Sequence, residues 1–164
     1  MPYALQSMLR IRTMREDRAS AELSAARQAV RQAAQIVLDR QADLAEFEKT
    51  KEERRDRIYA AILGHSITRD ECDLALEAVA RIDEEGVLKA DNVKLAQAEL
   101  KKKEEAAEDA RTNFVKASKE RMKITEHKAI WISEEAKAQE QRQEFELEDF
   151  TGKKNKENMD DIAD

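Results

Sequence analysis

The chain has 164 residues, of which 40% are charged and only 4% are aromatic, and its formal net charge is −6 at pH 7. Alanine supplies much of the 41% hydrophobic content and fills little volume, so the composition excludes a thick globular core and favours a thin seam between helices. The lack of a dominant basic face argues against nucleic acid as a partner.

The residues that most often begin or end helices mark only a few places in the chain. Proline is tolerated in the first turn of a helix, and glycine is the usual residue after its last turn. These two residue types occur at Pro2, Gly64, Gly86 and Gly152. The stretches between them are rich in strong helix formers, and they predict one long helix over 3–63 and another over 87–150.

The first predicted helix carries apolar residues at the alternating three- and four-residue spacing of a coiled coil. Arg12, Glu16, Lys51 and Arg54 interrupt this stripe and predict two polar, weaker stretches of the seam. The predicted core residues of this helix are Leu9, Ala19, Leu23, Val30, Val37, Leu44, Phe47 and Ile58.

The stretch from Gly64 to Gly86 is acidic, with two basic and seven acidic residues. Thr68 and Glu71 have the spacing of a capping box, and Ser66 is a rival cap. Apolar residues then recur on one helical face, which predicts a short helix over 67–85 that ends at the second glycine. The whole insert is expected to form the tip of a hairpin.

The last predicted helix repeats the heptad pattern of the first. Its predicted core residues are Val93, Leu100, Phe114, Ile124, Trp131 and Phe145. The fold class is therefore expected to be all-α, a long antiparallel two-helix coiled-coil hairpin over 1–151 with a short helix at the tip. If Leu63 faces Val87, the register places Trp131 opposite Ala19. The charged tail over 152–164 is expected to be flexible.

The sequence offers little for bond chemistry. The soft metal ligands are His65, Cys72 and His127, and the hairpin separates the last of these from the other two. Two ligands are fewer than a structural zinc site needs, and no glycine-rich phosphate loop or nucleophile elbow is present. We therefore expect neither a cofactor nor an enzyme. The single cysteine, the lack of a signal-like start and the lack of a long apolar run favour a cytoplasmic protein.

Four arginines lie close together near the start of the chain, interleaved with apolar residues: Arg10, Arg12, Arg15 and Arg18. One interpretation is a solvated face balanced by acidic residues of the other helix, at Glu144, Glu146, Glu148 and Asp149. The other is a cationic end that docks into an acidic collar, since the guanidinium fork pairs well with carboxylates. Several apolar residues cannot face a single partner helix and are expected to be exposed: Met8, Ile11, Met14, Ile36, Leu38, Ile130 and Ile132.

The order of residues at this end resembles the start of the YscO family of type III secretion proteins. The resemblance is carried by Leu9, Arg10, Ile11, Arg12, Arg15, Arg18 and Ala19, together with the length, the scarcity of proline and glycine and the charged tail. The YscO family is related to the flagellar export protein FliJ, and it also resembles the coiled-coil part of the gamma subunit of rotary ATPases. The acidic tip has no counterpart in the family motif.

The resemblance implies a non-enzymatic central stalk that couples a hexameric export ATPase to the export gate and binds export chaperones. It would be a monomer at the cytoplasmic face of a bacterial secretion apparatus, peripheral to the membrane through its partners. The ATPase-facing residues would be Arg10, Ile11, Arg12, Met14, Arg15 and Arg18, and the gate-facing residues would be Ile67, Leu76 and Val79. The alternative is a prefoldin-like or adaptor coiled coil that holds client proteins, which should oligomerise and expose apolar tips.

Overall fold

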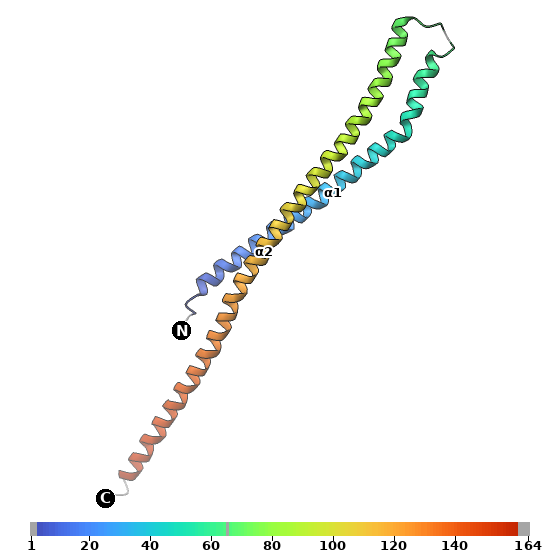
Figure 1. The fold of residues 1–164 in the computed structure, drawn as a ribbon. Helices are drawn as coiled ribbons and strands as arrows, with labels where there is room; N and C mark the ends of the chain where they lie inside the picture. Colours follow the sequence, from blue (N-terminus) through green and yellow to red (C-terminus); the bar gives the residue numbers. More distant parts are fainter. Residues whose placement is uncertain (1–2, 65, 161–164) are drawn as a thin grey trace. The chain divides into compact units, whose positions relative to one another are not determined.

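The computed structural model describes the backbone of residues 3–64 and 66–160 and the side chains of 3–64 and 66–147. Two helices make up the described chain: α1, Gln6–Ile62, and α2, Arg69–Asp160 (Figure 1). They pack against each other and run in opposite directions. The predicted all-α antiparallel hairpin is confirmed.

The first helix ends where the sequence predicts. Gly64 follows its last turn with a φ of 85°, a left-handed backbone conformation that residues with a Cβ rarely adopt. The amide of Leu63 still donates to the carbonyl oxygen of Tyr59 at 2.9 Å, so helical bonding continues up to the glycine.

The second helix begins with the predicted capping box. The amide of Thr68 donates to Glu71 Oε2 at 2.7 Å, and the amide of Glu71 donates back to Thr68 Oγ1 at 3.3 Å. These hydrogen bonds to the Thr68 backbone and hydroxyl lower the pKa of Glu71. Thr68, rather than Ser66, is therefore the residue that caps α2.

The predicted break at Gly86 is wrong. The second helix continues through it, so the short helix predicted over 67–85 is the first part of α2. A Cβ on this glycine would lie 2.9 Å from Phe47 Cε1, which means that the glycine makes room for the aromatic ring of the facing helix. The same helix also continues over 152–160. The flexibility of the tail stays a prediction, and 161–164 lie outside the described residues.

Loss of the break at Gly86 shifts the register between the helices. Lys51 Nζ lies 2.9 Å from Asp83 Oδ1, and Tyr3 lies against Trp131 with the ring centroids 5.4 Å apart. The predicted contact of Trp131 with Ala19 is therefore wrong. The predicted register centred the turn within the 64–86 insert, whereas the structure turns between Ile62 and Arg69, so each residue of α1 meets an earlier part of α2.

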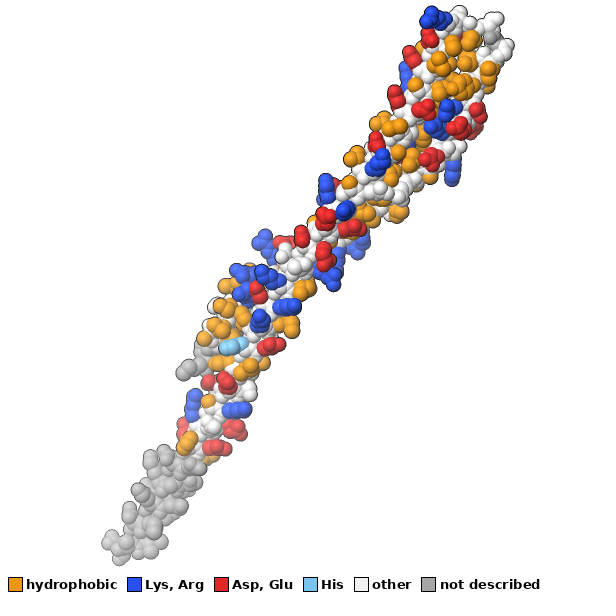
Figure 2. All heavy atoms as spheres, viewed as in Figure 1, with side chains coloured by type: hydrophobic (Ala, Val, Ile, Leu, Met, Phe, Trp, Pro, Cys, Tyr) orange, Lys and Arg blue, Asp and Glu red, His pale blue; other side chains and the backbone are white. Residues whose placement is uncertain are grey.

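The chain forms two compact units. The terminal unit comprises 1–18 and 114–164, and the turn unit comprises 19–113. Among the described side chains, the terminal unit buries one hydrophobic residue, Tyr3. The turn unit buries a row that extends along both helices: Ala19, Leu23, Ala33, Val37, Phe47, Ala75, Val79, Ile82 and Val93. In Figure 2, hydrophobic side chains gather between the two helices next to the turn.

Every predicted core residue except Phe145 is buried or half-buried. Phe145 is 71% exposed, so its place in the core prediction is wrong. Within the terminal unit, Tyr3 already packs against Trp131, and α2 runs on past the start of α1 (Figure 1). The heptad pattern of α2 therefore extends beyond the part of α2 that α1 can pack against.

Candidate functional site

Two ion pairs connect the helices of the terminal unit. Arg12 donates to Glu120, and Arg121 donates through Nε to Glu16, so each helix supplies one cation and one anion. The Glu16 side chain is 14% exposed, which makes this the more enclosed of the two pairs. These contacts explain why charged residues interrupt the heptad pattern of α1 at this place.

The environment of Glu16 favours its charged form. The hydrogen bond from Arg121 lowers the pKa of Glu16 most, a hydrogen bond from Ser118 lowers it further, and partial burial opposes both. A carboxylate held in this way stays ionised at neutral pH and fixes the guanidinium across the seam.

An aromatic cluster closes the seam near the start of α1. Tyr3 is 7% exposed, and its hydroxyl forms a 2.8 Å hydrogen bond with His127 Nδ1. Its ring centroid lies 5.8 Å from that of His127 and 5.4 Å from that of Trp131. Lys128 Nζ donates to Gln6 Oε1 at 2.9 Å beside this cluster. The segment before α1 is therefore tied to α2 by both packing and polar contacts.

Four of the six residues predicted to face an ATPase point away from the seam: Arg10, Ile11, Met14 and Arg15. Ile11 is 51% exposed and Met14 is 62% exposed, and both Arg10 and Arg15 are exposed. Neither of these two arginines pairs with any side chain that the structure describes. Residues three and four positions apart are neighbours on a helix, so this set forms one continuous patch. We call these four residues the outward patch.

The six residues that the sequence analysis predicted to face an ATPase lie in different environments in the structure. Arg12 pairs with Glu120 across the seam, so it is not counted in the outward patch. Arg18 is exposed and also has an interaction partner. The predicted counter-charges were Glu144 and Glu146, which are exposed, and two acidic residues whose side chains lie outside the described part. The correct partner of Arg12 requires the correct register, which the sequence pattern misplaced.

The prediction of off-seam apolar residues is confirmed. All seven are at least 44% exposed: Met8, Ile11, Met14, Ile36, Leu38, Ile130 and Ile132. They face away from the seam because the heptad stripe of their own helix is already used for packing.

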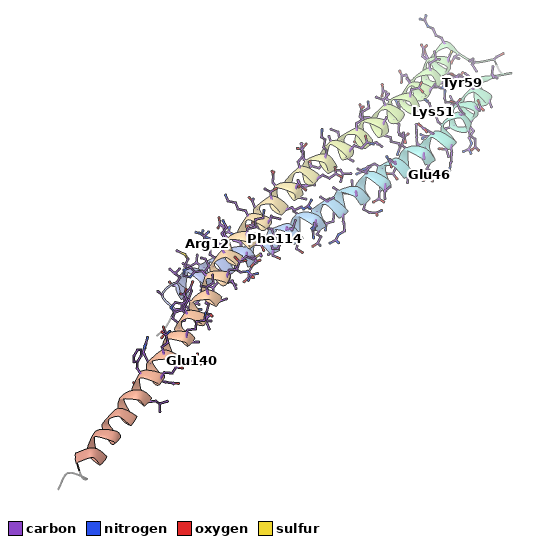
Figure 3. The ribbon with its side chains drawn as sticks, turned by 60° about the horizontal axis from the view of Figure 1, so that its bottom comes forward. Arg12, Glu46, Lys51, Tyr59, Phe114 and Glu140 are labelled. Carbon is purple, nitrogen blue, oxygen red and sulfur yellow. The ribbon has the colours of Figure 1, made fainter. Side chains whose placement is uncertain are left out.

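The turn unit holds its own set of ion pairs between the helices. Lys51 pairs with Asp83 at 2.9 Å, Arg54 pairs with Glu85 at 2.9 Å, and Arg55 lies 3.9 Å from Asp83. The hydrogen bond from Lys51 lowers the pKa of Asp83 most. Figure 3 marks Lys51 on the stretch of α1 that leads toward the turn. As in the terminal unit, the polar interruptions of the heptad face opposite charges.

Phe47 is the largest side chain in the turn-unit core and is 5% exposed. Its ring packs onto Gly86, with the guanidinium carbon of Arg54 5.6 Å and the Lys89 ammonium 5.9 Å from its centroid. Such distances permit cation–π attraction in addition to packing. This arrangement fixes which turn of α2 faces which turn of α1.

The three residues predicted to face a partner at the tip have different environments. Ile67 and Leu76 are exposed, at 39% and 55%. Val79 is 7% exposed and belongs to the seam, so the prediction that it faces a partner is wrong. The sequence signal for Val79 was its place on an apolar stripe, and in α2 that stripe packs against α1.

Among the residues that the structure describes, no helix combines the length and the apolar character needed to cross a membrane. The described His, Cys, Asp and Glu side chains also form no group of three or more arranged to hold a metal ion.

A family model matches most of the chain. The family model described as type III secretion protein YscO matches residues 5–153. No curated protein and no solved structure matches the chain. The matched stretch spans α1, the turn and most of α2, and it includes the outward patch.

Proposed function

The chain belongs to the YscO family of type III secretion proteins, and on that premise we propose that it is a non-enzymatic central-stalk component. In this proposal it couples a hexameric export ATPase to the export gate at the cytoplasmic face of the apparatus. The terminal unit contacts the ATPase, and the end of the hairpin at the turn faces the gate.

The outward patch carries the ATPase part of the proposal. Arg10 and Arg15 are exposed without an ionic partner among the described residues, and Ile11 and Met14 are exposed beside them. Guanidinium groups next to apolar side chains are typical of protein interfaces, where arginine pairs with carboxylates and methionine adapts to the partner surface. An acidic collar in a ring would complement this patch in charge and in polarity.

The ion pairs beside the patch have a different part in the proposal. Arg12 with Glu120, and Glu16 with Arg121, join α1 to α2 directly under the patch. A segment that transmits force or orientation to a ring needs its two helices to move together. We therefore assign Arg12 to holding the terminal unit together and assign ring contact to Arg10, Arg15 and Arg18.

At the other end of the hairpin, Ile67 and Leu76 are the proposed contacts with the gate. Both are exposed apolar side chains near the start of α2, and Val79 is removed from this set because it is buried. Export chaperones are a further proposed class of partner, for which several exposed apolar residues of the described chain are available.

The test uses the hexameric ATPase of the same secretion system and the purified chain. ATP turnover is measured with the original protein and with a variant in which Arg10→Glu and Arg15→Glu reverse two charges of the outward patch. The matched control reverses Arg27→Glu and Arg31→Glu, which are exposed on α1 within the turn unit. The proposal predicts stimulation by the original and the control, and loss of stimulation with the patch variant.

Two outcomes would contradict the proposal. Equal stimulation by the patch variant would mean that the arginines only solvate the helix. If no protein has any effect on turnover, the stalk function is rejected in favour of the adaptor.

The exposed leucines of the turn unit favour that second candidate, the adaptor. Leu74, Leu88 and Leu95 are each at least 63% exposed, and the last two lie seven residues apart. An adaptor that holds clients should also oligomerise, whereas the stalk should have the mass of a monomer.

A further inference from the structure

A groove of about 380 Å³ lies between α1 and α2 in the turn unit. From α1 it is lined by Arg54, Arg57 and Ile58, and from α2 by Ala78, Arg81, Ile82 and Glu85. Ala78 has the shortest side chain of this set. The groove uses none of the residues of the outward patch.

The floor of the groove is apolar. Ile82 is 5% exposed, and Ile58 and Ala78 are half-buried, so these three side chains form the edge of the helix seam at this place. An apolar side chain placed on them would remove more hydrocarbon from water and extend the existing seam outward.

Each arginine on the walls of the groove lies beside a carboxylate of this chain. Three arginines line it against a single carboxylate, Glu85, which already pairs with Arg54 at 2.9 Å. Arg57 pairs with Glu53 at 2.6 Å and Arg81 with Glu77 at 3.6 Å, each within its own helix. Both of these arginine side chains are more than 70% exposed, and exposed pairs of this kind hold their partners weakly. Their guanidinium groups are therefore available to an incoming carboxylate.

We propose that this groove binds an acidic amphipathic helix of a partner protein. One apolar side chain of that helix would lie on Ile58, Ala78 and Ile82, and carboxylates on either side of it would pair with Arg57 and Arg81. The groove favours this occupant over a basic helix because Arg57 and Arg81 line it, whereas their carboxylate partners do not. An amphipathic helix offers apolar and charged residues at the spacing that such a groove requires.

This inference goes beyond the stalk proposal and does not depend on it. The groove lies in the turn unit, and its test needs only the purified chain and a peptide. The probe is a fluorescently labelled synthetic helical peptide with leucine on one face and glutamate on the two flanks. Binding is measured by fluorescence anisotropy, and circular dichroism checks that each protein variant remains helical.

The first comparison reverses the groove charges. Arg57→Glu with Arg81→Glu should weaken binding of the acidic peptide on the order of tenfold or more, since two attractive charge pairs become repulsive. The matched control is Arg111→Glu, an exposed arginine of the same unit that also pairs with a carboxylate of its own helix, Glu108 at 3.5 Å. The control should bind the peptide as the original does.

The second comparison fills the groove without changing its charge. Ala78→Leu places a longer side chain over the floor and should weaken binding, while all three arginines remain. A peptide with lysine in place of glutamate should not bind to the original protein. The inference is overturned if the acidic peptide does not bind at all, or if it binds equally to the charge-reversed protein. Equal binding of the lysine peptide would also overturn it, as would a concentration-dependent rise in mass that Ala78→Leu abolishes, because a second copy would then be the occupant.

Discussion

The two units of the hairpin hold their helices together by different means. The turn unit has a continuous buried row of hydrophobic side chains, with Phe47 as its largest member. Among its described side chains the terminal unit buries only Tyr3, and its helices are joined by crossed ion pairs and an aromatic cluster. In line with the proposed function, we propose a division of tasks, in which the turn unit stabilises the fold and the terminal unit presents charged and apolar groups to a partner.

Both units place charged residues of the heptad pattern opposite charges of the other helix. In each unit the interrupting side chains of α1 face opposite charges on α2, as Arg12 faces Glu120 and Lys51 faces Asp83. Ion pairs of this exposure add little stability, but a mismatched register would separate these charges from their partners. These ion pairs therefore favour one alignment of the two helices, although they add little to its stability.

The largest effect is expected from the core of the turn unit. Phe47→Ala removes the largest side chain of the buried row in that unit and should lower the free energy of unfolding by about 3 kcal/mol. Chemical denaturation followed by circular dichroism measures the change. A loss well below 1 kcal/mol would mean that the turn unit is not the main source of stability.

Gly86 provides a matched test of the same contact. Gly86→Ala places a Cβ against the Phe47 ring. The cost of this close contact should offset the gain of about 1 kcal/mol that alanine brings to a helix interior, so no net stabilisation is expected. In the Phe47→Ala background the ring is gone, so the same substitution should stabilise by about 1 kcal/mol. Equal effects in both backgrounds would show that the glycine does not accommodate the ring.

The aromatic cluster is the corresponding test in the terminal unit. Tyr3→Ala should cost about 2 kcal/mol of local stability and expose Trp131, because the ring and its hydrogen bond to His127 are both lost. Tryptophan fluorescence and hydrogen exchange at the start of α1 report the change. Tyr3→Phe keeps the ring packing and should restore the fluorescence, whereas an unchanged spectrum in the alanine variant would contradict the cluster.

A smaller effect is expected at the start of α2. Thr68→Ala removes the cap hydroxyl that accepts from the Glu71 amide and should cost about 1 kcal/mol. Ser66→Ala is the matched control and should leave the denaturation midpoint unchanged. If the serine variant is the more damaging, the cap has been assigned to the wrong residue.

The smallest effect is expected at the crossed ion pairs. Glu16→Gln should cost about 0.5 kcal/mol at neutral pH, because the pair is partly exposed. Arg121 lowers the pKa of Glu16, so its contribution is present above the ordinary glutamate pKa of 4.5 and is lost as the pH falls through the lowered folded value. The variant should therefore show a shallower loss of stability on acidification. Identical acid titrations for both proteins would contradict the assignment.

Much of the fold follows from the sequence, and the errors have a common origin. The heptad stripe identified the helix faces, and Gly64 and the Thr68–Glu71 pair identified the turn. Gly86 was misread because a helix stop and a close helix contact both require glycine, and only the position of Phe47 distinguishes them. That single error moved the register.

The candidate site was predictable in its location but not in its details. The arginine cluster and its exposed neighbours are visible in the sequence, whereas the pairing of Arg12 with Glu120 depends on the register. Val79 and Phe145 were misplaced for a related reason. A helical stripe shows which face is apolar, but it does not show how far the facing helix extends along that stripe.

Hydrogen exchange of the chain, measured alone and with the hexameric export ATPase, tests the division of tasks most directly. In the free protein, the amides of 19–62 and 69–113 should exchange slowly and those of 6–18 faster, because the turn unit has the buried core. Addition of the ATPase should protect 6–18 and leave the turn unit unchanged. Protection confined to 69–113, or no protection in either unit, would contradict the account.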